Sequence, residues 1–371
     1  MKLGGLLSGD RAFLALVGAV VLLGLVMLTS ASGPQGFVKF NDAYYLLKHQ
    51  LIFGLLPGVF GLVIASRIPY TAYRRFAGAM LLVSLILLML VFIPGIGADF
   101  GTSHTWISLG KFSMQPSELV KLTFLFYLAA WMEKRGFNEL RDVESGLVPF
   151  MTVLGAIMLL LILQPDTGTM GVIVAMALAV YFVAGAPFRY FLAFGALGSF
   201  LFFLLIKLSP YRAARLTTFL HPELDPLGVG YHINQALLAV GSGGLFGRGY
   251  GHSLQKFQYL PEVAGDSIFA VLAEEMGFVL TTAFLVLYTA MLMRGLRIAD
   301  EAPDAFGRYL VTGIVTWLGI QAFVNIGAMV GILPITGVPL PFVSYGGTAL
   351  AVSMTAIGIV LNVSMHHAKR L

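Results

Sequence analysis

The chain has 371 residues, of which 58% are hydrophobic and only 11% are charged, and its formal net charge is +5. Soluble domains carry charged residues at about a quarter of their positions, so this composition excludes a water-soluble protein. Cysteine is absent, which excludes disulfides, thiolate metal sites and a cysteine nucleophile. The basic residues are spread between apolar runs instead of forming one patch, which argues against nucleic acid as a partner.

Apolar runs predict the membrane-spanning helices, each of which needs about 20 mostly apolar residues. In chain order the runs cover residues 12–30, 50–66, 76–93, 119–132, 147–163, 169–186, 190–206, 267–293, 309–330 and 345–363. The fourth run is short, and its helix can begin earlier, at Ser117. We therefore expect an all-α integral membrane protein with about ten transmembrane helices, forming a single domain over residues 1–371.

The distribution of Lys and Arg predicts the orientation of the chain. One set of connections contains Lys2, Arg11, Arg67, Arg74, Arg75, Lys134, Arg135, Arg141, Arg189, Arg294, Arg297, Arg308, Lys369 and Arg370. The short connections on the other side contain only Lys39, Lys48 and Lys111. Because cytoplasmic loops are enriched in Lys and Arg, both termini are predicted to be cytoplasmic.

A long polar segment with several Gly and Pro residues separates the seventh and eighth predicted helices, over approximately residues 207–266. Its basic residues do not contradict an outer location, because long loops are translocated largely regardless of charge. They are Lys207, Arg212, Arg215, Arg248 and Lys256. Loops of this length are usually functional or contain short helices, so we expect one or both here.

Ionisable residues at membrane depth are costly and by default indicate function. Glu118 and Lys121 are three residues apart, so they share a helix face and can pair. Either a structural ion pair or a contact with substrate explains them. Asp166 precedes a predicted helix, where an N-cap is the more common role and a direct contact with substrate is the alternative.

Asp266 lies where the long outer loop meets the eighth predicted helix. It can cap that helix. A half-desolvated carboxylate at this depth would also have a raised pKa, which suits a general base. Glu274 and Glu275 follow in the same helix, about 100° apart, so at least one of them is expected to face the interior of the bundle.

Two further segments are predicted to be irregular. The Gly-rich stretch 241–249 could bind phosphate through backbone N–H groups beside Arg248, although a flexible loop is the simpler interpretation. Residues 333–341 contain three prolines and predict an irregular loop at the outer surface. The seven His residues show no metal-binding spacing. Trp106 is the aromatic residue near a polar loop that could contact substrate.

Six short motifs, considered together, resemble one family. They are Gln115–Glu118, Gln164–Thr169, Asn234–Gln235 leading into Gly241–Gly244, Leu260–Glu262, Phe269–Glu275 and Pro341–Gly347. From its first helix to its last, the chain resembles the shape, elongation, division and sporulation family, whose members include FtsW, RodA and SpoVE. The resemblance implies a ten-helix protein of the bacterial cytoplasmic membrane that polymerises lipid II into glycan strands. It also implies a class B penicillin-binding protein as partner, with other membrane proteins of division or elongation.

The resemblance places the family's essential Asp at Asp266. Two positions depart from the family pattern: Thr105 precedes Trp106 where Arg is common, and Ala264–Gly265 stand where His-Thr is common. The segments Ser30–Ser32 and Arg67–Tyr70 look more like the division member, FtsW. Residues 337–342 are at least as similar to RodA. The FtsW-like interpretation is favoured.

The family's chemistry suggests a mechanism with inversion, in which Asp266 deprotonates the acceptor hydroxyl. The groups expected to neutralise the pyrophosphate are Arg212, Arg215, Arg248 and Lys256, with the possible help of Mg²⁺ or Mn²⁺; no obligatory cofactor is evident. Glu118, Lys121 and Glu274 would line the polar interior, and Asp166 and Trp106 would also contact substrate. A lipid II flippase is the main alternative, and a scaffold without enzymatic activity is a third.

Overall fold

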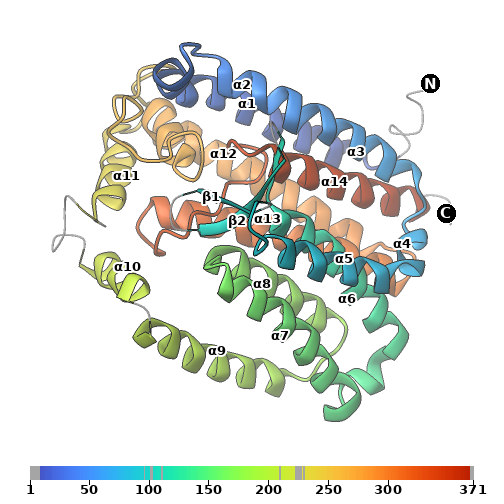
Figure 1. Ribbon diagram of the computed structural model, residues 1–371. Coiled ribbons are helices and arrows are strands. Elements are labelled where there is room, and N and C mark those ends of the chain that lie inside the picture. Colours follow the sequence, from blue (N-terminus) through green and yellow to red (C-terminus); the bar gives the residue numbers. More distant parts are fainter. Residues whose placement is uncertain are drawn as a thin grey trace.

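The computed structural model describes residues 9–95, 97–100, 103–109, 112–208, 210–221, 228 and 230–367. Long helices lie side by side in a bundle, with short helices and loops at its two ends (Figure 1). The long helical segments are α1 (Arg11–Phe40), α2–η2–α3 (Tyr45–Arg67), α5 (Ala77–Leu90), α6 (Pro116–Leu140), η3–α7 (Val143–Leu163), α8 (Thr167–Val183), α9 (Phe188–Leu208), α12 (Ile268–Asp300), α13 (Ala305–Met329) and α14 (Gly347–His367). The expected all-α membrane fold is confirmed.

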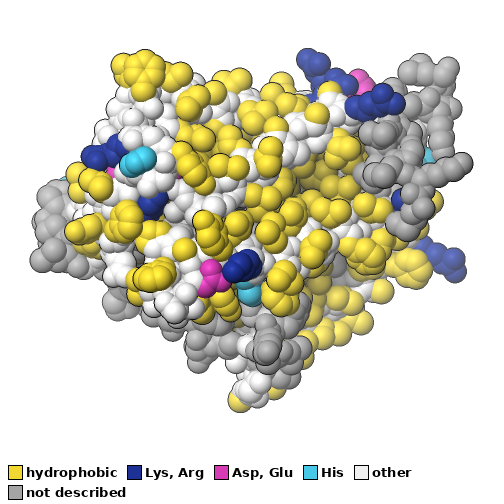
Figure 2. Space-filling model, turned by 90° about the horizontal axis from the view of Figure 1, so that it is seen from above, with side chains coloured by type: hydrophobic (Ala, Val, Ile, Leu, Met, Phe, Trp, Pro, Cys, Tyr) yellow, Lys and Arg dark blue, Asp and Glu magenta, His cyan; other side chains and the backbone are white. Residues whose placement is uncertain are grey.

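Length and composition support membrane insertion. Seven of these segments are long and apolar enough to cross a membrane, and α5 and α8 are shorter apolar helices. The remaining long helix, α6, contains the buried pair Glu118 and Lys121. Hydrophobic side chains are spread over much of the described part of the face seen in Figure 2, with few charged side chains among them, as expected for a surface in contact with lipid.

The centre of the bundle is formed by α13 and α14, both of which are largely buried. Glycines allow α14 to approach α3 closely. A Cβ added to Gly358 would lie 2.4 Å from the carbonyl oxygen of Leu62, and one added to Gly61 would lie 2.1 Å from Oγ1 of Thr355. Small residues at such crossings are typical of membrane helices, whose association depends on close packing.

The two ends of the described chain meet at one end of the bundle (Figure 1). The backbone N–H of Asp10 donates to Oγ of Ser364 at 3.1 Å. The carboxylate of Asp10 caps α1 and also binds Nε of Arg294 at 2.7 Å. Arg74 pairs with Glu133 at this end, at 2.9 Å. The first and last described residues therefore lie at the same end of the bundle as Arg74 and Arg294, in agreement with the distribution of Lys and Arg, and the termini themselves lie outside the described residues.

A small antiparallel sheet lies between α5 and α6, where the sequence interpretation contained no strands. Its strands are β1 (Gly97–Phe100), β2 (Ser103–Leu109) and β3 (Phe112–Met114), in the order β1-β2-β3. Thr105 and Ile107 of β2 are buried and alternate with half-buried Trp106 and Ser108. This alternation is the pattern of a half-buried strand, in a segment too short and polar to cross the membrane.

The outer loop contains α10 (Pro210–Leu220) and α11 (Tyr231–Ser242), followed by a turn-rich segment that leads to α12. A short helix, α4 (Thr71–Arg75), lies at the opposite end of the bundle. The expectation that the long loop contains short helices is therefore confirmed. The loop segment after α11 returns over the end of α12 and α1 (Figure 1), and this return positions the candidate site.

Candidate functional site

Asp266 is half-buried and immediately precedes Ser267, which is the N-cap residue of α12. The interpretation of Asp266 as the helix cap is therefore wrong by one residue. The reason is a tight turn before the helix: the N–H groups of Gly265 and Ser267 both donate to the carbonyl oxygen of Glu262, at 2.9 and 3.2 Å. This turn delays the start of α12 and leaves Asp266 at the junction between loop and helix.

The backbone around Asp266 is held by α13. The side-chain amide of Asn325 donates to the carbonyl oxygen of Asp266 at 2.7 Å and to that of Val338 at 2.8 Å. Asn325 is 2% exposed, so these bonds form away from bulk water, where an unmade bond is costly. Asn325 therefore ties Asp266 to the irregular segment that follows α13. Sequence reasoning did not single out Asn325.

That irregular segment holds the residues just before Asp266 as well. The hydroxyl of Ser344 donates to the carbonyl oxygen of Gly265 at 2.7 Å, and the N–H of Tyr345 donates to that of Ala264 at 2.7 Å. The two positions that depart from the family pattern, Ala264 and Gly265, thus contribute backbone carbonyls. Any residue supplies such carbonyls, so these bonds do not depend on the side chains that stand there.

The helix α11 contacts the same junction. The hydroxyl of Ser267 donates to the carbonyl oxygen of Pro261 at 2.7 Å, and Nε2 of His232 lies 2.6 Å from the same hydroxyl oxygen. Since the hydroxyl proton is directed to Pro261, His232 donates its Nε2–H to Ser267. Elements from three parts of the chain therefore fix the backbone that carries Asp266.

The Gly-rich stretch was predicted to be a phosphate cradle or a flexible loop. Instead, its residues 244–249, called the strap below, run across an interruption in α12 and bond to its backbone. The helix breaks at Gly277, where φ is +71° and ψ is −179°. The N–H groups of Arg248 and Gly249 donate to the carbonyl oxygens of Glu274 and Glu275, each at 3.0 Å. A phosphate would need N–H groups such as these, and here they are occupied.

The strap, residues 244–249, also accepts hydrogen bonds from the residues that follow the break in the chain. The N–H of Phe278 donates to the carbonyl oxygen of Gly244 at 2.9 Å, and the N–H of Val279 donates to that of Leu245 at 3.1 Å. A broken helix is tolerated at membrane depth only where its freed backbone groups find partners in the protein. The strap supplies these partners on both sides of Gly277.

Glu275 anchors the outer loop through a buried network. Its Oε1 lies 2.8 Å from Nζ of Lys256, and it accepts from the hydroxyl of Ser30 at 2.7 Å. Nζ of Lys256 also donates to Ser30 Oγ and to the carbonyl oxygen of Gly251, at 2.8 and 2.7 Å. Lys256, predicted to neutralise pyrophosphate, would have to leave one of these partners to make that contact.

Glu274 is directed at the loop as well. Its carboxylate accepts from the hydroxyl of Ser253 at 2.5 Å and from the N–H of Leu254 at 3.0 Å, and Nε of Arg248 lies 3.5 Å away. Both adjacent glutamates are buried, in agreement with the expectation that at least one faces inward. The sequence could not indicate that both would bind the outer loop.

A second polar cluster lies deeper in the bundle. Nζ of Lys121 lies 2.8 Å from Oε1 of Glu118 and 2.7 Å from Oε1 of Gln321, and both ends of the ion pair are buried. The indole N–H of Trp317 also donates to Gln321, at 2.7 Å. The amide nitrogen of Gln321 donates to Pro339 O at 2.9 Å. The cluster therefore reaches the same irregular segment that holds Asp266.

Asp166 accepts from the N–H of Thr169 at 3.0 Å and is the N-cap of α8, so the capping prediction is confirmed. Its other oxygen accepts from Ser117 Oγ at 3.2 Å. Trp106 lies on β2, opposite Ala98 of β1, and is half-buried. A direct contact of Asp166 or Trp106 with substrate stays a prediction.

The remaining predicted groups are basic residues and a cation. Arg212 and Arg215 belong to α10, but their side chains lie outside what the structure describes. Within the described ranges, no three His, Cys, Asp or Glu side chains come together as a metal site. Among the described residues, therefore, none forms a ligand set for the Mg²⁺ or Mn²⁺ ion considered in the sequence analysis.

Comparison with known proteins agrees with this architecture. A family model described as cell cycle protein, covering FtsW, RodA and SpoVE, matches residues 10–369. Stage V sporulation protein E of Bacillus subtilis is 40% identical over 97% of this chain and 98% of its own length. A probable peptidoglycan glycosyltransferase FtsW of Trichlorobacter lovleyi is also 40% identical, over 96% of this chain and 93% of its own length.

Solved structures show the same fold. One similar chain is 30% identical, with a TM-score of 0.79 and 98% of both chains covered. It comes from a structure described as "Structural coordination of polymerization and crosslinking by a peptidoglycan synthase complex". The rod shape determining protein RodA of Thermus thermophilus is 30% identical, with a TM-score of 0.71 and 98% and 97% covered. The chain belongs to the FtsW, RodA and SpoVE family of cell cycle proteins.

Proposed function

We propose that this protein is a peptidoglycan glycosyltransferase that polymerises lipid II at the outer face of the membrane, with Asp266 as its general base. Family membership and the names of the FtsW relatives support the activity. The relatives named above are a sporulation protein and an FtsW, so we propose a role in division or sporulation in preference to elongation.

The chemistry requires one base. The donor sugar is α-linked to pyrophosphate and the glycan is β-linked, so a single displacement with inversion suffices. Asp266 takes the proton of the acceptor hydroxyl as its oxygen bonds to the anomeric carbon, and the bond from that carbon to the pyrophosphate oxygen breaks. Glycosidases need a second carboxyl group to protonate a poor leaving group, whereas pyrophosphate leaves as a stable anion.

One observation supports this assignment above the others: the backbone on both sides of Asp266 is fixed while its carboxylate stands at the outer junction. Asn325, Ser344 and Tyr345 bind the carbonyl oxygens of residues 264–266, and His232 binds Ser267. A catalytic group is effective when the surrounding structure holds it in position before the reaction. The partner, a class B penicillin-binding protein, is proposed from the resemblance to a peptidoglycan synthase complex.

The test is polymerisation of fluorescent lipid II by the purified protein, alone and with a class B penicillin-binding protein. Asp266→Asn keeps the size of the side chain and removes the base, so the rate should fall by about 10²–10⁴-fold. The thermal unfolding midpoint should not change. Asp42→Asn is the matched control, because Asp42 is an outer aspartate paired with exposed Lys48, and its rate should stay near wild type.

Full activity of Asp266→Asn would overturn the assignment of the base. If the wild type failed to polymerise even with the partner and Mg²⁺ present, the glycosyltransferase proposal would fail as a whole. Translocation of lipid II across liposomes would then test the flippase alternative, for which the buried pair Glu118 and Lys121 would be the first residues to replace.

A further inference from the structure

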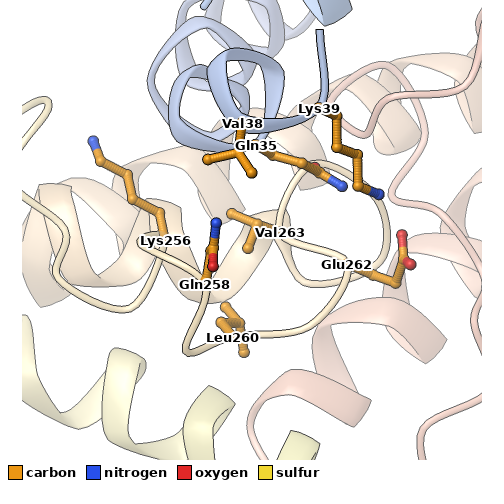
Figure 3. A pocket seen from close by; sticks show the side chains of 8 residues that line it. All are labelled: Gln35, Val38, Lys39, Lys256, Gln258, Leu260, Glu262 and Val263. Atoms are coloured by element: carbon orange, nitrogen blue, oxygen red, sulfur yellow. The ribbon is translucent and has the colours of Figure 1, made fainter. Parts of the chain in front are cut away.

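A cavity of about 310 Å³ opens between the outer end of α1 and the loop that leads to Asp266 (Figure 3). It is lined by Gln35, Val38, Lys39, Lys256, Gln258, Leu260, Glu262 and Val263. Ligand pockets span roughly 300–1,000 Å³, so this one is at the small end. Its volume is of the order of one sugar ring with a substituent.

The polar groups of the lining come from both sides of the cavity. Gln35 and Lys39 extend from α1, and Gln258 and Glu262 extend from the loop (Figure 3). Val38, Leu260 and Val263 add apolar surface between them. Lys256 contributes its stem, while its ammonium points away from the cavity toward Glu275.

This combination matches an N-acetylated sugar. A carboxylate accepts hydrogen bonds from sugar hydroxyls, and an ammonium donates to ring or hydroxyl oxygens. A side-chain amide can bind both the N–H and the C=O of an acetamido group. The apolar residues provide a surface for the acetyl methyl group and the C–H face of the ring. Amides and a pair of opposite charges suit an uncharged ligand rich in hydroxyls better than they suit a pyrophosphate.

Two of the polar lining residues have strained backbones. Gln258 has φ of +68° and Glu262 has φ of +46°, a region that favours glycine. Hydrogen bonds hold this conformation: the N–H of Leu260 donates to Gln255 O, and the N–H of Gly265 donates to Glu262 O, both at 2.9 Å. Such strain is concentrated at functional sites, where the fold orients a side chain for a purpose.

The cavity is coupled to the candidate base through one turn. Glu262 lines the cavity with its side chain, while its carbonyl oxygen accepts from the N–H groups of Gly265 and Ser267, on either side of Asp266. A ring bound against Glu262 would therefore be held at a fixed position relative to Asp266. This geometry suits a sugar next to the one that reacts.

We propose that this cavity binds an N-acetylated sugar ring of the glycan strand, adjacent to the reacting ring, and keeps the strand attached between successive additions. The inference rests on the proposed function, to which it adds a second saccharide subsite. Its ligand class is an N-acetylhexosamine, recognised by Gln258, Glu262, Gln35 and Lys39.

The first experiment measures binding without chemistry. Saturation-transfer NMR with N,N′-diacetylchitobiose and the detergent-solubilised protein should show transfer to the acetyl methyl groups, and cellobiose should show at least fivefold less. Gln258→Gly removes the amide and relieves the backbone strain, so the protein should stay folded and the chitobiose signal should fall at least fivefold. Gln258→Asn keeps an amide on a residue that tolerates positive φ, and should retain an intermediate signal.

Lys48→Ala is the matched control, because it removes an exposed outer lysine that does not line the cavity. Its chitobiose signal should equal that of wild type. Equal signals from wild type and Gln258→Gly would overturn the proposal. A signal that appears with the dipeptide Ala-Ala and not with chitobiose would also overturn it, in favour of a peptide subsite.

The second experiment measures strand length during lipid II polymerisation. Gln258→Gly should shorten the mean glycan strand at least threefold, and Lys48→Ala should leave it unchanged. The two proposals fail separately. Chitobiose binding without polymerisation would refute the enzyme and leave the saccharide site standing. Polymerisation with wild-type strand length and no chitobiose binding would refute the saccharide site alone.

Discussion

Nζ of Lys256 and Oε1 of Glu275 are 2.8 Å apart, and their side chains are only 4% and 0% exposed. The pair joins the outer loop to α12, and Ser30 of α1 completes it with bonds to both partners. The neighbouring pair differs: Arg248 lies 3.5 Å from Glu274 and is 37% exposed. Two adjacent glutamates thus bind the same loop, one through a cation removed from water and one through a cation that is partly solvated.

Lys256→Met should destabilise the protein strongly, because it leaves the carboxylate of Glu275 buried without its cation. Breaking a buried pair in this way costs about 3–5 kcal/mol. Arg248→Gln should cost only about 0–1 kcal/mol, since Glu274 keeps its bonds to Ser253 and Leu254. Thermal unfolding in detergent measures both. Equal midpoints for the two variants would contradict the distinction between them.

The deeper pair, Glu118 and Lys121, is open to a test that separates structure from substrate binding. Lys121→Met alone should cost about 3–5 kcal/mol, because it leaves Glu118 as an unpaired buried charge. The double variant Lys121→Met/Glu118→Gln removes both charges and should recover most of the unfolding midpoint.

Lipid II polymerisation by that double variant then decides between the two roles. Activity that returns together with stability identifies a structural ion pair. A stable variant with activity at least tenfold below wild type identifies a substrate contact. Trp317→Phe, which removes one donor to Gln321 and keeps an aromatic ring beside Nζ of Lys121, is the control.

Gly277 and Gly136 provide a matched comparison of strain with and without a clash. Both have φ of +71° within helices, with ψ of −179° and 175°, a region occupied almost only by glycine. A Cβ on Gly277 would lie 2.1 Å from the nitrogen of Gly247, whereas one on Gly136 would meet nothing within 4 Å.

Gly136→Ala should therefore cost about 1–3 kcal/mol for the backbone strain alone, and Gly277→Ala should cost more. Because the strap must move to admit the new methyl group, Gly277→Ala should also lower lipid II polymerisation. Unfolding midpoints and polymerisation rates check both parts. A Gly277→Ala protein as stable as Gly136→Ala would contradict the close contact between strap and helix.

A pH effect is expected at the cytoplasmic turn before η3. The backbone N–H and hydroxyl of Ser145, with the N–H of Glu144, bind the carboxylate of Asp142 and lower its pKa below the ordinary value. A carboxylate whose pKa is lower in the folded than in the unfolded protein stabilises the fold at pH values above its unfolded pKa of about 3.9. This stabilisation is lost as the pH falls through the folded-state pKa. Asp142→Ala should thus be less stable than wild type at pH 6, with a difference that shrinks toward pH 3. A difference independent of pH would contradict the ionised cap.

The helices could be predicted because each depends on composition within one short segment. The position of Asp266 at the loop–helix junction followed from where polar sequence gives way to apolar sequence, and the cap at Asp166 followed from local spacing. The pairing of Glu118 with Lys121 is likewise a local relationship, three residues along one helix.

The features that were missed depend on residues far apart in the chain. Lys256 and Glu275 are bridged by Ser30, 226 residues from Lys256, and Asn325 reaches Asp266 from 59 residues away. The role of the Gly-rich strap depends on a break in α12, which apolar residues on both sides of Gly277 conceal. The three strands are short, and a hydropathy pattern dominated by helices gave no signal for them.

The break at Gly277 has a mechanical consequence. After it, α12 presents Phe278, Val279 and Leu280 outward, and these side chains are 67%, 48% and 54% exposed. Before it in the chain, the first turns of the helix are bonded to the strap and the outer loop. The same strap also bonds to Phe278 and Val279 beyond the break, so it bridges the interruption. The strap therefore holds the two parts of α12 in one alignment, although the helix between them is discontinuous.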